Sequence, residues 1–205
     1  MRSLSTAVLS LVAMALSSMT TYLTFFDARY TLTQAVASVQ LQVQSGGGSS
    51  NGEKSAYYRY YPHPQIILSN RGTRPLVLSN VELVKSSTLE TCTEDESAEI
   101  PQARTFEAII VEPGTVQQLP LELALPAVSQ EVAEDEEFDL QPDTALWCLK
   151  WTAFDPNGER QEPLTPVFTT EITFTPPEPG DRYPSTNVEL DFPKGPTKLI
   201  TRGWF

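Results

Sequence analysis

The stretch Val39-Gln40-Leu41-Gln42-Val43-Gln44 alternates apolar and polar side chains without a break. Successive side chains of a β-strand point to opposite faces of a sheet, so this period of two predicts a strand with one buried and one solvent-facing side. Valine, which is β-branched, also favours extended backbone. The stretch therefore indicates a chain built from β-sheet.

The same period recurs along the chain, and turn residues interrupt it. The 17 prolines and 10 glycines lie largely between short apolar runs, as they do in proteins with many strands and loops. Seven or so short strands with such turns predict an all-β, two-sheet sandwich. Beyond residue 44 the predicted strands are 65–69, 74–84 with a bulge at Ser79-Asn80, 106–111, 119–125 with Pro120 at a sheet edge, 145–154, 166–174, and an edge strand over Val188–Phe192.

Three polar segments are interpreted as loops. Ser45–Ser50 is rich in Gly and Ser, a composition typical of flexible connections. Residues 85–104 and 130–139 are acidic and are interpreted as solvated loops. A calcium site would need oxygen ligands at an ordered spacing and a glycine for the turn, and residues 130–139 lack this pattern.

The N-terminal segment carries no charged residue from Ser3 to Phe26. As a helix it would extend about 36 Å, enough to cross a hydrocarbon core of about 30 Å. Arg2 precedes the segment, Asp27 and Arg29 follow it, and aromatic residues cluster at its far end. This arrangement predicts a single-pass signal anchor over about residues 3–26, with the rest of the chain outside the cytoplasm.

A cleaved signal peptide is the alternative interpretation of the same segment. Ala7–Leu16 would be its apolar region, and Ala13-Met14-Ala15 or Ala15-Leu16-Ser17 its cleavage motif. The many Ser and Thr residues of the segment favour this alternative, whereas the apolar end at Tyr22–Phe26 favours the anchor. Cleavage would leave an exported, soluble binding protein.

These features divide the chain into three parts. Residues 1–36 form the anchor with a short stalk, which is predicted to continue the helix over residues 27–36. Residues 37–175 form the sandwich, and residues 176–205 form a Pro-rich C-terminal extension with the edge strand.

Two turn motifs carry a resemblance to a known kind of domain. Asn70-Arg71-Gly72-Thr73-Arg74-Pro75-Leu76 and Val111-Glu112-Pro113-Gly114 resemble turns that join strands in bacterial immunoglobulin-like sandwich domains. The resemblance covers about residues 37–175 and implies an immunoglobulin-like sandwich, without implying a specific function. With the anchor, the outline is similar to uncharacterised membrane-anchored bacterial proteins.

The chain has two cysteines, Cys92 and Cys148. An exported domain folds in an oxidising compartment, so we predict that the two form a disulfide. Cys148 lies between Trp147 and Leu149 in a predicted strand and therefore faces away from the apolar side of that strand. The bond should pin the acidic loop to the outer face of a sheet instead of crossing the core.

Charge and composition argue against several classes of function. The formal charge of -12 disfavours nucleic acid, because phosphate binding needs clustered Lys and Arg. The only histidine, His63, lies between two prolines, and neither a nucleophile–base pattern, a zinc pattern nor a phosphate-binding loop accompanies it. We therefore expect no catalytic residue, metal or cofactor. A hydrolase with two carboxylates is the rival interpretation and would require a cleft with facing acids.

The aromatic run Tyr57, Tyr58, Tyr60 and Tyr61, with Arg59, is the predicted partner-contact patch, because Tyr and Arg are enriched at protein interfaces. Ordinary packing at one end of the sandwich is the alternative interpretation. Taken together, the sequence predicts a membrane-anchored, extracytoplasmic (periplasmic) interaction or structural module. Its expected partners are the lipid bilayer, through the helix, and another envelope or membrane protein.

Overall fold

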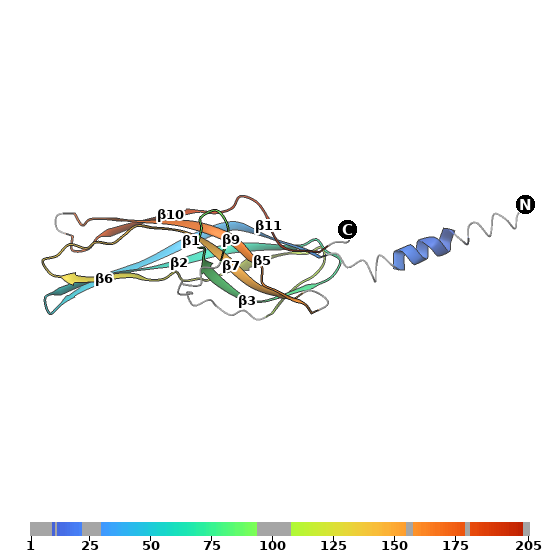
Figure 1. Ribbon diagram of the computed structural model, residues 1–205, viewed down its shortest axis with the longest axis horizontal. Coiled ribbons are helices and arrows are strands. Elements are labelled where there is room, and N and C mark those ends of the chain that lie inside the picture. The colour runs from blue at the N-terminus through green and yellow to red at the C-terminus, as the bar shows by residue number, and fades with distance from the viewer. Residues whose placement is uncertain are drawn as a thin grey trace, which may run out of the picture.

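Figure 1 shows the chain as a computed structural model, in which two β-sheets pack face to face. The structure describes Ser10 and residues 12–21, 30–93, 108–154, 158–178 and 181–202. Strands dominate these residues, and all the strand pairs are antiparallel. The prediction of an all-β, two-sheet architecture is confirmed.

Sheet A has the strand order β11-β1-β2-β5, and β6 also pairs with β2. Sheet B has the order β10-β9-β7-β3-β4, and β8 also pairs with β7. The strands of sheet A are β1 (Tyr30–Ser50), β2 (Glu53–Asn70), β5 (Val116–Pro120), β6 (Val128–Ala133) and β11 (Thr197–Arg202). The strands of sheet B are β3 (Leu76–Lys85), β4 (Ile109–Val111), β7 (Asp143–Phe154), β8 (Arg160–Gln161), β9 (Leu164–Thr175) and β10 (Ser185–Asp191).

A long hairpin of β1 and β2 forms the frame of sheet A. Its strands pair from Leu32 opposite Asn70 to Ser50 opposite Glu53. The turn consists of Asn51 and Gly52, which have φ values of 57° and 80°. Positive φ at both central residues is the requirement of a type I′ hairpin turn, for which Asn-Gly is the favoured sequence.

The predicted flexible loop at Ser45–Ser50 is wrong, because these residues continue strand β1. Two aromatic rings explain the glycines. A Cβ on Gly46 would lie 2.5 Å from the Tyr57 hydroxyl, and a Cβ on Gly47 would lie 2.5 Å from the Tyr183 ring. Close packing therefore explains these glycines without a need for flexibility, most strictly at Gly47, where a Cβ would also lie 2.7 Å from the Ser55 carbonyl oxygen.

The predicted helical stalk over residues 27–36 is also wrong for its described part, because β1 begins at Tyr30. Sheet A thus starts before the predicted domain boundary at residue 37. Leu32 and Val36 face the core, and the polar Gln34 lies between them on the same face. A buried glutamine breaks the apolar alternation, and this hides the strand in the sequence.

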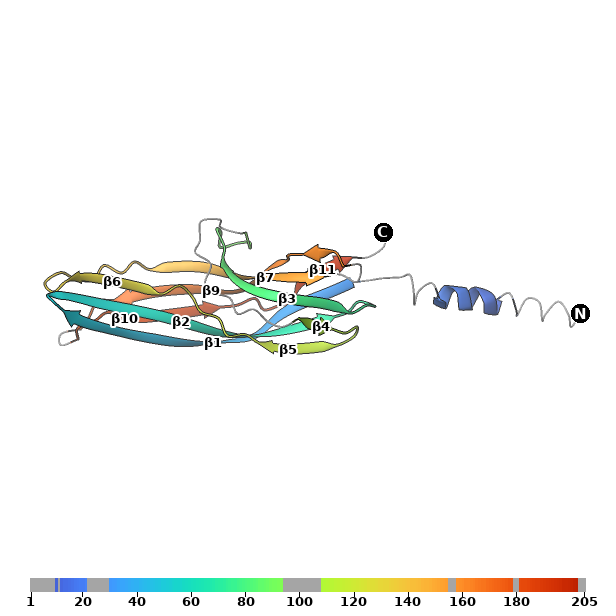
Figure 2. The same cartoon turned by 90° about the horizontal axis from the view of Figure 1, so that it is seen from below.

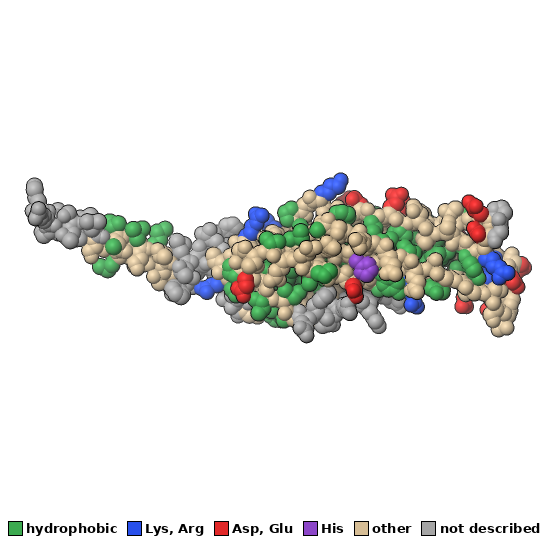
Figure 3. Space-filling view, turned by 180° about the vertical axis from the view of Figure 1, so that it is seen from behind, with side chains coloured by type: hydrophobic (Ala, Val, Ile, Leu, Met, Phe, Trp, Pro, Cys, Tyr) green, Lys and Arg blue, Asp and Glu red, His purple; other side chains and the backbone are tan. Residues whose placement is uncertain are grey.

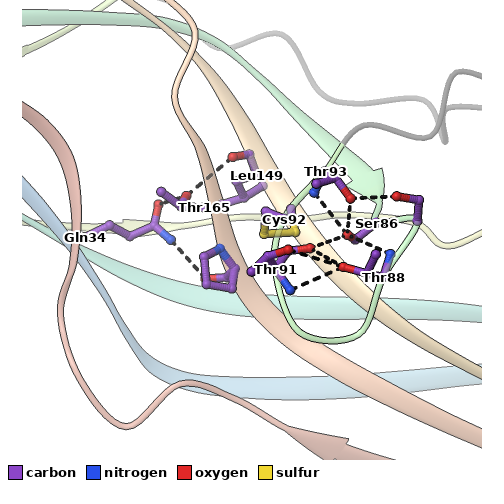
Figure 4. Close-up of a disulfide and its surroundings, with 11 residues drawn as sticks. Gln34, Ser86, Thr88, Thr91, Cys92, Thr93, Leu149 and Thr165 are labelled. Atoms are coloured by element: carbon purple, nitrogen blue, oxygen red, sulfur yellow. Dashed lines mark hydrogen bonds between the residues drawn. A yellow bond between two sulfur atoms is a disulfide. The ribbon is translucent and has the colours of Figure 1, made fainter.

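The buried Gln34 side chain has hydrogen-bond partners at both its oxygen and its nitrogen. Trp151 Nε1 donates to Gln34 Oε1 over 2.9 Å, and Thr165 Oγ1 donates to the same oxygen over 3.0 Å. Gln34 Nε2 donates to the carbonyl oxygen of Pro166 over 3.5 Å. A buried amide is costly when it lacks partners, and Gln34 of sheet A finds its partners on sheet B, so this network joins the two sheets. Figure 4 shows Gln34 beside Thr165.

Two prolines inside β2 shape the neighbouring segment. The carbonyls of Pro62 and Pro64 accept hydrogen bonds from the backbone N–H groups of Leu123 and Leu121. Both backbone groups of an antiparallel residue point to the same side, so the missing proline donors also face this segment. The ladder is incomplete there, and the chain between β5 and β6 lies along β2 without forming a regular strand.

Asn70 joins the two turn motifs that carry the sequence resemblance. Its Nδ2 donates to the carbonyls of Arg74 over 2.9 Å and Val111 over 2.8 Å, and its Oδ1 accepts from the Gly72 N–H over 2.8 Å. Its backbone also bonds the turn at Gly114. The fully buried Asn70 therefore fixes the β2–β3 turn against the β4–β5 turn.

The C-terminal region belongs to the sandwich. The predicted edge strand is confirmed as β10, which among the described strands pairs with β9 only. Strand β11, which no sequence pattern indicated, pairs with the start of β1 and brings the described end of the chain beside Tyr30. The acidic loop predicted at 130–139 is partly wrong, since Val128–Ala133 form edge strand β6 with Glu131 pointing outward.

The single described helix covers residues 12–21. Among the residues that the structure describes, no helix is both long and apolar enough to cross a membrane. The predicted transmembrane helix over residues 3–26 is therefore not seen, and residues 3–9, 11 and 22–26 of that span lie outside the described part.

Replacing Asn70 with Ala should destabilise the sandwich by about 1–3 kcal/mol or more, because it leaves buried backbone groups without partners. Urea unfolding of the two proteins measures the difference. Asn187→Ala, an exposed change in β10, is the matched control and should shift the free energy of unfolding by less than about 0.5 kcal/mol. Equal stability of N70A and the wild type would contradict the role given to Asn70.

Candidate interaction surface

The structure divides the predicted contact patch between the two faces of β2. Tyr58 and Tyr60 point into the core and are 3% and 0% exposed. Tyr57, Arg59 and Tyr61 point to the outer face of sheet A. The prediction is therefore wrong for Tyr58 and Tyr60, because the period of two in a strand places alternate residues on opposite faces.

The two buried tyrosines hold β10 over sheet A. The Tyr58 hydroxyl donates to the carbonyl oxygen of Pro184, and the Tyr60 hydroxyl lies 3.0 Å from the Thr186 hydroxyl. Tyr58 also packs on Phe174 of β9, with ring centroids 5.2 Å apart. Burial raises the pKa of both phenols above the ordinary tyrosine value of 10.0, and the neighbouring Tyr60 adds to the shift at Tyr58.

The outer face of β1 and β2 is polar and aromatic. Gln40, Gln42 and Gln44 of β1 lie opposite His63, Tyr61 and Arg59 of β2. The Tyr61 hydroxyl donates to Gln44 Oε1 over 3.5 Å, and Arg59 Cζ lies 6.0 Å from the centre of the Tyr57 ring. We call this set of seven residues the Gln/Tyr face: Gln40, Gln42, Gln44, Tyr57, Arg59, Tyr61 and His63.

The Gln/Tyr face differs in charge from the rest of the chain. None of its seven residues is acidic, although the chain has 26 Asp and Glu residues. Glu122 borders the face, in the segment that lies along β2 next to His63. Figure 3 shows His63, the only histidine, on this side of the molecule, and red acidic side chains gather at the end away from the helix. Tyr57 is 40% exposed and gives the face an accessible ring.

The disulfide between Cys92 and Cys148 lies on the other sheet. Its Cα atoms are 6.0 Å apart, and the pair links the segment after β3 to β7. Cys148 is fully buried with Val84 and Leu146 in a small cluster separate from the main core. The prediction that the bond lies on the outer face of a sheet is confirmed. Closing this segment of 56 residues contributes about 4 kcal/mol in the chain-entropy model.

The loop held by this disulfide is ordered by hydroxyl groups. Ser86 Oγ donates to the carbonyl of Thr91 over 2.7 Å and accepts from the Thr93 N–H over 3.1 Å. Figure 2 shows the described part of the loop standing away from sheet B, and Figure 4 shows its hydrogen bonds around the disulfide. Leu89 is 55% exposed in this loop. The described part of the predicted acidic loop thus projects from sheet B and is held to it by the disulfide.

A shallow groove of about 430 Å³ lies at the end of β10. Its lining includes Leu146, Phe168 and Phe192, with Asp191 and Lys194. Asp191 is the one carboxylate among the described residues that line it. Hydrolysis by paired acids needs two facing carboxylates, so this groove does not support the rival hydrolase interpretation.

Comparisons with protein families, curated proteins and solved structures found no match to this chain. The sequence analysis missed the glutamines as part of the Gln/Tyr face, although their alternation with Val39, Leu41 and Val43 already placed them on one face. It also missed Tyr183, whose contact with Gly47 depends on long-range packing that no local pattern indicates.

The raised pKa values predict how stability depends on pH. A phenol whose pKa is higher in the folded state stabilises the fold fully below about 10 and loses that contribution as the pH rises through the folded-state pKa. Tyr60→Phe removes one such ionisation, and also the hydrogen bond to Thr186, for a cost of about 0.5–1.5 kcal/mol near neutral pH. Between about pH 8 and about pH 11, urea unfolding should show a smaller loss of stability in Y60F than in the wild type. Parallel pH profiles would contradict this assignment.

Proposed function

We propose that this chain is a membrane-anchored, extracytoplasmic β-sandwich that serves as a protein-interaction or structural module. The Cys92–Cys148 disulfide supports the compartment, because such bonds persist in the periplasm and other oxidising environments. The two turn motifs that meet at Asn70 support a relationship to bacterial immunoglobulin-like domains. The lipid bilayer and another envelope or membrane protein are the proposed partners.

The proposed anchor is supported by the sequence of residues 3–26. This span has no charged residue, and its described residues 12–21 are helical. Val12, Met14, Leu16 and Met19 of this helix are more than half exposed, so they do not pack on the sandwich in the described structure. An apolar helix surface of this kind is suited to lipid contact.

The Gln/Tyr face carries the proposed interaction role. It presents an accessible tyrosine, a neighbouring arginine and glutamine amides on the outer surface of a sheet. Tyr and Arg make the largest contributions in many protein interfaces, and the neighbours of Arg59 on this face, Gln44, Tyr57 and Tyr61, carry no charge. Such a surface on an acidic protein suits a partner that binds through shape complementarity and hydrogen bonds.

Changing Tyr57 and Arg59 together to Ser should weaken partner binding about tenfold or more, because the face loses its aromatic and cationic contacts. Cross-linking in intact cells, followed by detergent solubilisation and mass spectrometry, would compare the proteins recovered with each variant. The matched control is Thr144→Ala with Glu171→Ala, an exposed cross-strand pair on the outer face of sheet B. If Y57S/R59S recovers the same partners as the wild type and the control, the Gln/Tyr face is not the interface.

The anchor predicts that the mature protein retains residues 1–26 and remains with membranes after an alkaline wash. Val12→Arg should reduce insertion, at a cost of about 2.5–3.5 kcal/mol near the helix centre. Membrane fractionation and intact mass measure both effects. A soluble mature protein with a new N-terminus near Ser18 would instead establish the cleaved, exported alternative.

A further inference from the structure

Strand β1 has an open edge along most of its length. On one side it pairs with β2 throughout, whereas on the other side β11 pairs only with Tyr30–Gln34. From Ala35 to Ser50, sixteen residues therefore have no strand partner on that side within the described chain. This open edge is about 53 Å long at the usual rise of a strand. An irregularity near Ala37 precedes a regular register from Ser38 to Ser50.

The open edge lacks the protection that the other edge strands carry. An unpaired strand can join another chain, and proteins usually prevent this with charges, proline or short length. The open edge of β1 contains no charged residue and no proline, although the chain as a whole is acidic. The other described edges are protected by Glu189 and Asp191 in β10, Lys198 in β11, Pro120 in β5, Glu131 in β6, and by the three-residue length of β4.

Val43 marks the centre of the open edge. It lies opposite the buried Tyr60 and so faces the core side of sheet A, yet it is 41% exposed. Val39 and Leu41, its neighbours on the same face, are packed against the core. No described strand lies beyond β1 here, so the side of Val43 that faces away from β2 is open in the described structure.

We propose that the open edge of β1 pairs with the same edge of a second copy of this chain, antiparallel and centred on Val43. When two identical strand edges are related by a two-fold axis, the unpaired backbone N–H and C=O groups of each edge bond to the same groups of the other. The register must place core-facing residues of one copy opposite core-facing residues of the other. The paired residues must also end before the part of β1 that pairs with β11. A centre at Val43 meets both conditions, places the two Val43 side chains together, and sets Gln42 opposite Gln44 of the second copy.

Charge also favours a second copy in this register. Two chains of charge -12 repel, so their acidic regions must lie apart. The hairpin end of each copy carries Glu53 and Glu134, and antiparallel pairing sends these ends in opposite directions. Each acidic end then lies near the partner's β10–β11 connection, where the exposed Lys194 and Lys198 outnumber Asp191.

The proposal rests on the proposed interaction role and deepens it by naming one partner. It also constrains the anchored protein. In this register the two Tyr30 positions lie about 86 Å apart along the joined sheet. Two copies anchored in one membrane would therefore lie with their long axes along its surface.

The experiment uses the full chain in detergent, with mass measured by sedimentation, and Val43 variants. The wild type should be a dimer, whereas Val43→Lys and Val43→Glu should each be monomeric, because like charges would face each other across the axis. Mixing V43K with V43E should restore a dimer containing one of each. Val116→Lys, at an exposed valine of β5, is the matched control and should remain dimeric.

Cysteine cross-linking tests the register independently. Both native cysteines are in the disulfide, so an introduced cysteine is the only free thiol. Val43→Cys should form a cross-linked dimer under mild oxidation, whereas Val39→Cys should not, because its two copies would lie about 26 Å apart. A monomeric wild type, a dimeric V43K or cross-linking at Val39 would each overturn the proposal. If V43K loses the dimer but still binds the partner proteins that require Tyr57 and Arg59, then dimerisation through β1 and partner binding through the Gln/Tyr face are separate interactions. Loss of those partners in Y57S/R59S with dimers retained would likewise test the Gln/Tyr face alone.

Discussion

The strict alternation of side chains along β2 is the constraint on which sheet A depends. Every second residue from Ala56 to Asn70 is buried, and β1, β5 and β6 all take their register from this strand. A slip of one residue would expose the whole buried set, so the register is fixed. The same constraint assigns the outer side of β1 and β2 to solvent, and thereby creates the Gln/Tyr face.

The sequence predicts this architecture where apolar residues alone fill the core side of a strand. Residues 39–44 and 145–154 show the pattern directly, and both are strands. The prediction fails where packing is satisfied by other means. Gln34 occupies a core position because Trp151 and Thr165 donate to it, and Gly46 lies in a strand because Tyr57 covers it. Both contacts join residues that are far apart in the sequence or lie on neighbouring strands, so no local sequence period indicates them.

The candidate surface was predictable in part. A period of two separates Tyr58 and Tyr60 from Tyr57 and Tyr61 without any structure, but it does not say which pair is buried. That choice depends on β10, because Pro184 and Thr186 provide hydrogen-bond partners for Tyr58 and Tyr60. The prolines at 62 and 64 further obscured the strand, since a central strand rarely contains them. Their missing N–H donors face the segment between β5 and β6, which does not form a complete β-ladder with β2.

The distribution of charge gives the open edge of β1 its meaning. An acidic chain that needed only solubility would place charge first on its longest unpaired edge. None of the described carboxylates lies on this edge, although β6, β10 and the hairpin end carry several, while the regular alternation of β1 continues through Val43, which is 41% exposed. Burial against sheet B therefore does not account for an uncharged valine at this position. In the proposed dimer Val43 lies next to Val43 of the second copy, so a charged residue there would face an identical charge. Pairing therefore requires an uncharged residue at position 43, whereas packing against the core does not.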